Sequence, residues 1–195
     1  MMILDIENLK DARITLTLLF INILIFFLFN LAAPNEILLI FVQINRNIIE
    51  NHEIWRLFTS MFFHADPIHL FSNMLALLFF GATVENNTVI SKVQYLIIYF
   101  VSGLIGNVFS LLLLPFDAIS LGASGAIFGL LGVAFVMIAT DYQPLLFFAL
   151  FYIVFFIAYS FTPGINYWAH LFGLAGGILF GYLFYTRKKK IRFVS

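Results

Sequence analysis

The chain has no cysteine and little charge, with ten Lys and Arg residues balanced by ten Asp and Glu residues among 195. The missing thiols exclude disulfides, thiolate metal sites and cysteine nucleophiles. The net charge of zero says nothing about nucleic acid, but no basic patch interleaved with aromatic residues suggests a nucleic-acid partner, and we expect none. Hydrophobic residues instead make up 63% of the chain, and the mean hydropathy is +1.03. A soluble domain of this size cannot bury so much apolar surface, so we expect a single domain, residues 1–195, in a lipid bilayer.

Six apolar segments are bounded by polar or helix-breaking residues, and each approaches the roughly 20 residues that cross a hydrocarbon core. They predict an all-α polytopic membrane protein with six transmembrane helices, at about 14–33, 67–84, 92–114, 122–140, 144–161 and 166–186. The longest connection, 34–66, is itself apolar in places. We expect it to lie in the membrane interface or against the bundle.

Positive charge predicts the orientation of the chain in the membrane. The segment before the first span carries acidic residues and is followed by no small-residue cleavage site, so we expect that span to remain as an uncleaved anchor. If both termini are cytoplasmic, only Arg46 and Arg56 lie outside. The other eight positive residues are then inside: Lys10, Arg13, Lys92, Arg187, Lys188, Lys189, Lys190 and Arg192. This favours a multi-pass protein of the plasma or inner membrane.

Two polar residues stand out because they lie just inside apolar runs. Ser124 opens the fourth span and His170 opens the sixth. In the predicted orientation the second, fourth and sixth spans all run from outside to inside, and His69, Ser124 and His170 each lie near the start of one of them. Ser124 and His170 are therefore expected at similar depth, about 10 Å or less below the outer surface. An ionisable residue at membrane depth indicates a functional site, and a serine beside it suggests a nucleophile and its base.

The sequence Gly122-Ala123-Ser124-Gly125 places the serine where a helix begins. Backbone N–H groups that are unpaired there can stabilise an oxyanion, and glycines let a peptide approach. The alternative is that Ser124 only caps the helix.

Glycines on two spans predict a close helix contact. The fourth span carries a stripe of small residues, and the sixth span carries another on the face of His170; the stripes are Gly125, Gly129 and Gly132, and Gly173 and Gly177. Such spacing permits close approach of membrane helices, which a serine–histidine hydrogen bond requires. The alternative is ordinary helix packing, which such stripes usually indicate; here packing and catalysis would need the same contact.

Polar residues also open the second span, where His69 and Asn73 share one helical face. Both can donate hydrogen bonds, as an oxyanion hole requires. Alternatives are solvation at the interface or a metal site that uses His64, Asp66 and His69; Pro67 and the lack of a second carboxylate disfavour a metal.

No acidic residue is expected near His170, which favours a Ser–His dyad over a triad. The ten acids fall in loops or at the ends of spans. Phe128 lies one turn after Ser124, where its ring can stack on the imidazole and orient it.

Together these motifs resemble the rhomboid family of intramembrane serine proteases. The resemblance runs, in order, through Trp55-Arg56, His64, His69, Asn73, Glu85, the Gly122–Gly125 segment, and Ala169-His170 followed by Gly173 and Gly177. It implies that Ser124 is the nucleophile and His170 the general base. It also implies an oxyanion hole made by the Ser124 N–H, His69 and Asn73, a supporting role for His64, and structural roles for Trp55, Arg56 and Glu85.

The resulting expectation is a serine endopeptidase that cuts in or near transmembrane segments of membrane proteins, without a cofactor, at a site opening to the outer side. One alternative is a non-catalytic rhomboid-like protein that binds transmembrane helices. A channel or transporter is disfavoured because the inner halves of the fourth and sixth spans are nearly all apolar.

Overall fold

The computed structural model describes residues 6–31, 34–162 and 164–187. Six segments are long and apolar enough to cross a membrane: Arg13–Asn30, Pro67–Glu85, Lys92–Leu113, Ser124–Asp141, Gln143–Ser160 and Tyr167–Thr186. Their bounds lie within two residues of the predicted spans, except at the end of the first span. There the predicted residues 32 and 33 lie outside the described part of the chain, as do the basic residues 188–190 and 192.

The spans form an all-α bundle, as predicted. Its elements are α1 (Ile6–Asp11), α2 (Arg13–Phe26), α3 (Asn35–Phe41), β1 (Gln43–Ile44), α4 (Asn45–Asn51), α5 (Arg56–Thr59), α6 (Pro67–Ala76), α7 (Ala82–Glu85), α8 (Lys92–Leu113), β2 (Ile119–Ser120), α9 (Ser124–Asp141), α10 (Leu146–Ser160) and α11 (Tyr167–Phe180). Short 3₁₀ turns cover Ser60–Phe62 and Gln143–Leu145, and π-helical turns cover Phe27–Leu31, Leu77–Gly81 and Gly181–Thr186.

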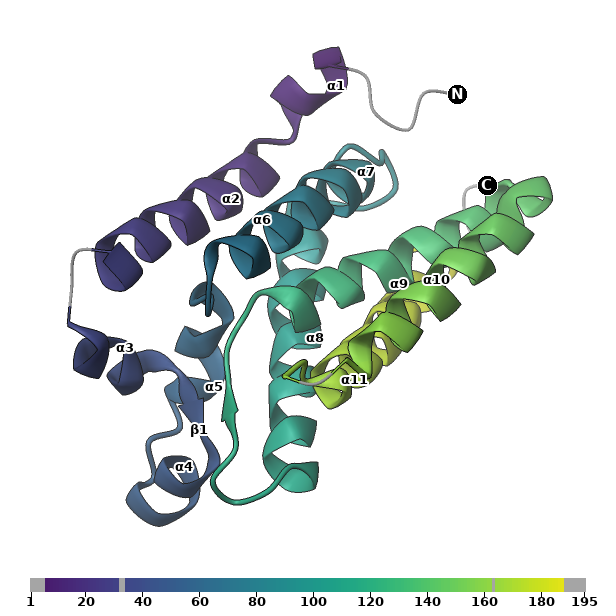
Figure 1. Ribbon diagram of the computed structural model, residues 1–195. Coiled ribbons are helices and arrows are strands. Elements are labelled where there is room, and N and C mark those ends of the chain that lie inside the picture. Colours follow the sequence, from purple (N-terminus) through teal and green to yellow (C-terminus); the bar gives the residue numbers. More distant parts are fainter. Residues whose placement is uncertain (1–5, 32–33, 163, 188–195) are drawn as a thin grey trace.

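Successive spans alternate in direction (Figure 1). The helix α1 and the far end of the sixth span lie at one end of the bundle, whereas α3, α4, α5 and β1 gather at the other. This second end also holds the starts of the second, fourth and sixth spans. The three polar residues singled out in those spans therefore lie toward the same end of the molecule.

The starts of α6 and α8 follow from local capping. The Asp66 carboxylate accepts hydrogen bonds from the backbone N–H groups of Ile68 and His69 at 2.8 and 2.9 Å, with Pro67 as the first residue of α6. Ser91 and Gln94 form a capping box at α8. These contacts satisfy N–H groups that a helix leaves unpaired at its first turn, so they fix where these two helices begin.

The long connection between the first two spans is ordered against the bundle. Its strand β1 pairs antiparallel with β2, with Gln43 opposite Ser120. The Asn45 N–H also donates to the Ala118 carbonyl at 3.2 Å. Since β2 lies four residues before Ser124, the connection holds the segment that leads into α9.

The fourth span is the centre of the bundle and the fifth is its periphery. In α9, 61% of the spanning residues are buried, against 6% of the segment Gln143–Ser160 that contains α10. Close packing between α9 and α11 depends on glycine: a Cβ at Gly173 would lie 2.2 Å from the Gly125 carbonyl oxygen, and one at Gly177 would lie 1.9 Å from that of Gly129. On the same seam, a Cβ at Gly132 would lie 2.6 Å from the Leu174 carbonyl oxygen. No side chain fits between these backbones.

Glu85 ties the first two spans together at the end of the bundle where α1 lies. Its carboxylate accepts from the N–H groups of Ile14 and Thr15 at 3.0 and 2.7 Å and pairs with Lys92 at 2.9 Å. Since α2 has no cap of its own, Glu85 supplies one from a distant part of the chain.

Candidate active site

The turn before α9 orients Ser124 and requires a glycine at position 122. Gly122 has a φ of +130°, a backbone region that side chains rarely adopt. Its N–H donates to the Ser60 carbonyl at 2.9 Å. Ala123 stands at the N-cap position without a side-chain cap, so Ser124 is the first residue of α9. The capping alternative for Ser124 is therefore wrong, and its hydroxyl is available for another partner.

The start of α11 positions His170 through Asn166. The Asn166 side chain accepts from the Ala169 N–H at 3.1 Å and so caps the helix. Its amide nitrogen donates to the hydroxyls of Ser110 on α8 and Ser120 on β2, at 2.8 and 2.9 Å. One side chain thus connects the beginning of α11 to the strand that leads to Ser124. The sequence analysis did not identify Asn166.

Ser124 and His170 meet across the α9–α11 contact. The Ser124 Oγ and His170 Nε2 lie 2.7 Å apart, a hydrogen-bond distance. His170 is 8% exposed. The Phe128 ring stacks on the imidazole with centroids 4.3 Å apart and planes 8° from parallel. This geometry is suited to proton transfer between the hydroxyl and the imidazole.

The other nitrogen of His170 contacts a residue that the sequence analysis missed. His170 Nδ1 lies 2.6 Å from the hydroxyl oxygen of Ser160, the last residue of α10. A serine hydroxyl therefore lies at each ring nitrogen, and among the residues that the structure describes no carboxylate contacts either nitrogen. Within its own apolar run, Ser160 carries no pattern that distinguishes it from a serine at an ordinary helix end.

His69 lies beside the turn that carries Ser124. Its Nδ1 accepts from the Ala65 N–H at 3.3 Å, so in the neutral ring Nε2 carries the proton. A Cβ at Gly122 would lie 2.9 Å from this Nε2 and 3.7 Å from the Ser124 Oγ. A donor and a candidate nucleophile therefore flank the same glycine.

Asn73 lies one turn further along the same span, where it is 6% exposed and bonded within its own helix. Its amide nitrogen donates to the His69 carbonyl at 2.9 Å. A primary amide has two N–H donors, so one remains for another acceptor.

His64 packs behind His69 and is fully buried. The two rings make an edge contact, with centroids 5.1 Å apart and planes at 67°. Burial, and then repulsion from His69, lowers the pKa of His64 to about 3. His64 is therefore a neutral ring at physiological pH, and its backbone carbonyl accepts from Asn30 at 2.8 Å.

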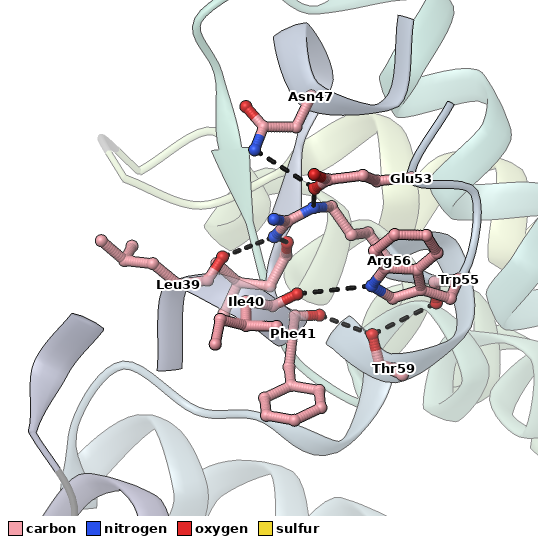
Figure 2. Close-up of polar contacts among 9 residues, drawn as sticks. Leu39, Ile40, Phe41, Asn47, Glu53, Trp55, Arg56 and Thr59 are labelled. Carbon is pink, nitrogen blue, oxygen red and sulfur yellow. Dashed lines mark hydrogen bonds and ion pairs between the residues drawn. The ribbon is translucent and has the colours of Figure 1, made fainter. Parts of the chain in front are cut away.

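Trp55 and Arg56 lie apart from this site and hold the first connection together (Figure 2). The buried Arg56 guanidinium donates to the carbonyls of Leu39 and Val42 at 2.5 and 2.8 Å, and also pairs with Glu53. The hydrogen bond from Arg56 lowers the pKa of Glu53. The half-exposed Trp55 indole lies 3.5 Å from the Ile40 carbonyl.

A metal site at the start of the second span receives no support from the geometry. Across residues 6–31, 34–162 and 164–187, no three His, Cys, Asp or Glu side chains come together as ligands for a metal. The Asp66 Oδ1 instead accepts the two N–H groups that cap α6.

Known proteins resemble the chain over most of its length. The family model described as the Rhomboid domain matches residues 51–187. "Putative rhomboid protease YdcA" of Bacillus subtilis is 35% identical over 150 residues, 73% of each chain. "RHOMBOID-like protein 1" of Arabidopsis thaliana is 37% identical over 146 residues, which cover 72% of this chain but 37% of that protein. "Inactive RHOMBOID-like protein 8" of the same plant is 35% identical over 94 residues, 48% of this chain and 26% of the relative. The chain therefore belongs to the rhomboid family of multi-pass membrane proteins.

Proposed function

We propose that this protein is an intramembrane serine endopeptidase that hydrolyses peptide bonds in or near transmembrane segments of other membrane proteins. The observation that carries the proposal is the 2.7 Å contact between Ser124 and His170, which join from separate spans of a membrane-embedded bundle. One relative is also named as a rhomboid protease.

The proposed reaction begins at the contact between the two side chains. His170 Nε2 accepts the Ser124 proton while Oγ attacks the scissile carbonyl carbon. The tetrahedral intermediate then collapses, its C–N bond breaks, and His170 gives the proton to the leaving amine. A water molecule attacks the acyl-enzyme ester, His170 accepts the proton from the water, and returning it to Ser124 Oγ restores the free enzyme.

Three donors around Gly122 are proposed to stabilise the oxyanion. They are the backbone N–H of Ser124, the Nε2–H of His69 and the free amide hydrogen of Asn73. The first lies at a helix start, where N–H groups are unpaired and the helix dipole favours negative charge. His69 flanks the same glycine as Ser124, so its Nε2–H lies near the position where the carbonyl attacked by Ser124 would bind.

A substrate of this site must expose a peptide bond to Ser124. Carbonyl groups inside an intact α-helix are hydrogen-bonded and shielded, so we propose substrates whose transmembrane helix unwinds readily near the cut. With both termini cytoplasmic, the site opens toward the outer side of a plasma or inner membrane.

Binding of transmembrane helices without cleavage is the second candidate, because one relative is named inactive. It makes no use of the Ser124–His170 contact. The two functions therefore differ in whether the Ser124 hydroxyl is reactive.

A fluorophosphonate probe tests that reactivity directly. We expect the detergent-purified protein to be labelled at Ser124, as identified by peptide mass, and labelling to be lost in Ser124→Ala. Labelling should fall by at least about 100-fold in His170→Ala, because a serine without its base is a weak nucleophile. If the wild-type protein is not labelled, or if His170→Ala is labelled at the wild-type rate, the proposal is wrong and helix binding becomes the better account.

A further inference from the structure

We propose that Ser160 is a positioning residue that fixes the orientation and tautomer of His170. The inference rests on the proposed protease function and extends it, because it assigns the role that a carboxylate plays in a Ser–His–Asp triad to a neutral hydroxyl on a different span.

The tautomer follows from counting protons. The Ser160 hydroxyl lies 2.7 Å from the Phe156 carbonyl, which can only accept, so its single proton is donated there. The same oxygen lies 2.6 Å from His170 Nδ1, and with its proton committed it must accept from an N–H on that nitrogen. In a neutral ring Nε2 is then unprotonated, and it faces the Ser124 Oγ at 2.7 Å. This is the only neutral tautomer that can act as a base toward Ser124.

The placement of Ser160 on α10 is unusual for that helix. Ser160 is 1% exposed, and it is the one residue among Leu146–Ser160 that is fully buried. Its neighbours Tyr159 and Phe161 are each 60% exposed. A serine that only bonds its own helix needs no burial, since an i−4 carbonyl is available at any position. The buried hydroxyl therefore serves its contact with His170.

Two surfaces hold the imidazole. Phe128 stacks on its face and Ser160 bonds its edge, so the ring is restrained in tilt by α9 and in rotation by α10. The bond also makes the protonation state of His170 Nε2, which faces Ser124, depend on the position of α10. Apart from Ser160, this helix has no buried residue.

Tautomer and kinetics test the inference together. Protein with ¹⁵N-labelled histidine is compared at pH 7.5 as wild type, Ser160→Ala and Ser160→Thr, with His170→Asn to assign the His170 signals. The control is Thr140→Ala, which removes another helical hydroxyl bonded to an i−4 carbonyl, at 2.7 Å and away from any histidine. We expect a protonated Nδ1 and an unprotonated Nε2 in the wild type and in Ser160→Thr, and a mixture of tautomers in Ser160→Ala.

For cleavage of a transmembrane substrate, we expect Ser160→Ala to lower kcat about tenfold with KM unchanged, as loss of one hydrogen bond to the base implies. Ser160→Thr should restore most of the activity, and Thr140→Ala should retain it. A wild-type His170 protonated at Nε2, or a Ser160→Ala variant with kcat within twofold of wild type, would overturn the inference.

Failure of the protease function itself is recognised separately. In that case the wild-type protein neither cleaves nor reacts with a fluorophosphonate, whereas the tautomer spectra still report whether Ser160 sets the protonation of His170.

Discussion

Gly122 shows how much the site depends on one backbone conformation. Its φ of +130° lets the chain turn sharply into α9, and the missing side chain leaves room for His69 Nε2. A Cβ there would meet that nitrogen at 2.9 Å. The residue therefore combines two separate requirements for glycine, a strained backbone and a close contact.

Gly122→Ala should impair both stability and catalysis. We expect a loss of about 1–3 kcal/mol in unfolding free energy from backbone strain, and more than a tenfold loss of cleavage because His69 must move. Gly164→Ala is the matched control. Gly164 also has a positive φ, +87°, but a Cβ there would meet nothing within 4 Å. Gly164→Ala should therefore lower the unfolding free energy through backbone strain but leave cleavage unchanged. Equal losses of activity in the two variants would contradict the close-contact argument.

His64 predicts a loss of stability in mild acid. Its folded pKa of about 3 lies below the ordinary 6.5, so the unfolded state binds more protons between these values. The stability that His64 contributes is complete above pH 6.5 and is lost as the pH falls toward 3. Between pH 7.5 and 5.0 the change is about 2 kcal/mol.

Unfolding by SDS in mixed micelles at pH 7.5 and 5.0 measures this change. His64→Phe, which keeps a ring of similar size without a titratable group, should reduce the pH dependence by that amount. An unchanged pH dependence in the variant would show that His64 does not titrate on unfolding.

At the scale of the elements, the geometry of the proposed Ser124–His170 dyad depends on how closely α9 and α11 approach. Backbone carbonyls of α9 lie against glycines of α11 at Gly173 and Gly177. Separation of these helices would lengthen the distance from Ser124 to His170, since each helix carries one of the two residues. Helix packing and the proposed catalysis therefore depend on the same contact between α9 and α11.

Gly177→Ala tests the seam against its neighbour Gly176→Ala. The Cβ of the first would lie 1.9 Å from the Gly129 carbonyl oxygen, whereas that of the second would meet the flexible end of Ile105 and the Ser102 hydroxyl at 3.3 Å. We expect a loss of about 1–3 kcal/mol and of most cleavage for Gly177→Ala, and a change within about 1 kcal/mol for Gly176→Ala. SDS unfolding and cleavage rates measure both, and identical behaviour would refute the role of the seam.

The six spans and the polar residues Ser124 and His170 were predictable from the sequence, because only long apolar segments cross a bilayer and polar residues inside them are rare. Long apolar runs must be spans, and Ser124 or His170 inside such a run indicates a function. Partners across the fold were not predictable. Ser160 resembles any serine at a helix end, and Asn166 any polar cap, because their bonds depend on how separate helices pack.

At the scale of the whole molecule, the connection between the first two spans, residues 34–66, was also only partly predictable from the sequence. Its apolar residues predicted an element held against the bundle or the interface, which the structure has. The carbonyls that Arg56 binds, those of Leu39 and Val42, have no signature in the sequence, since every residue carries a carbonyl.

The orientation of the bundle is testable because the natural chain has no cysteine. Single cysteines are introduced at exposed positions near opposite ends, as Glu50→Cys on α4 and Thr88→Cys between α7 and α8. With cytoplasmic termini, an impermeant maleimide should label Glu50→Cys in intact spheroplasts and Thr88→Cys only after permeabilisation. The reverse pattern would invert the proposed topology.

The most direct test of the protease proposal is cleavage of a single-span membrane protein by the purified protein in detergent, beside Ser124→Ala. We predict a product from the wild type, with the cut in or next to the transmembrane segment by mass, and none from the variant, whose fold should be unchanged because only one hydroxyl is removed. Equal product from Ser124→Ala would contradict the central claim.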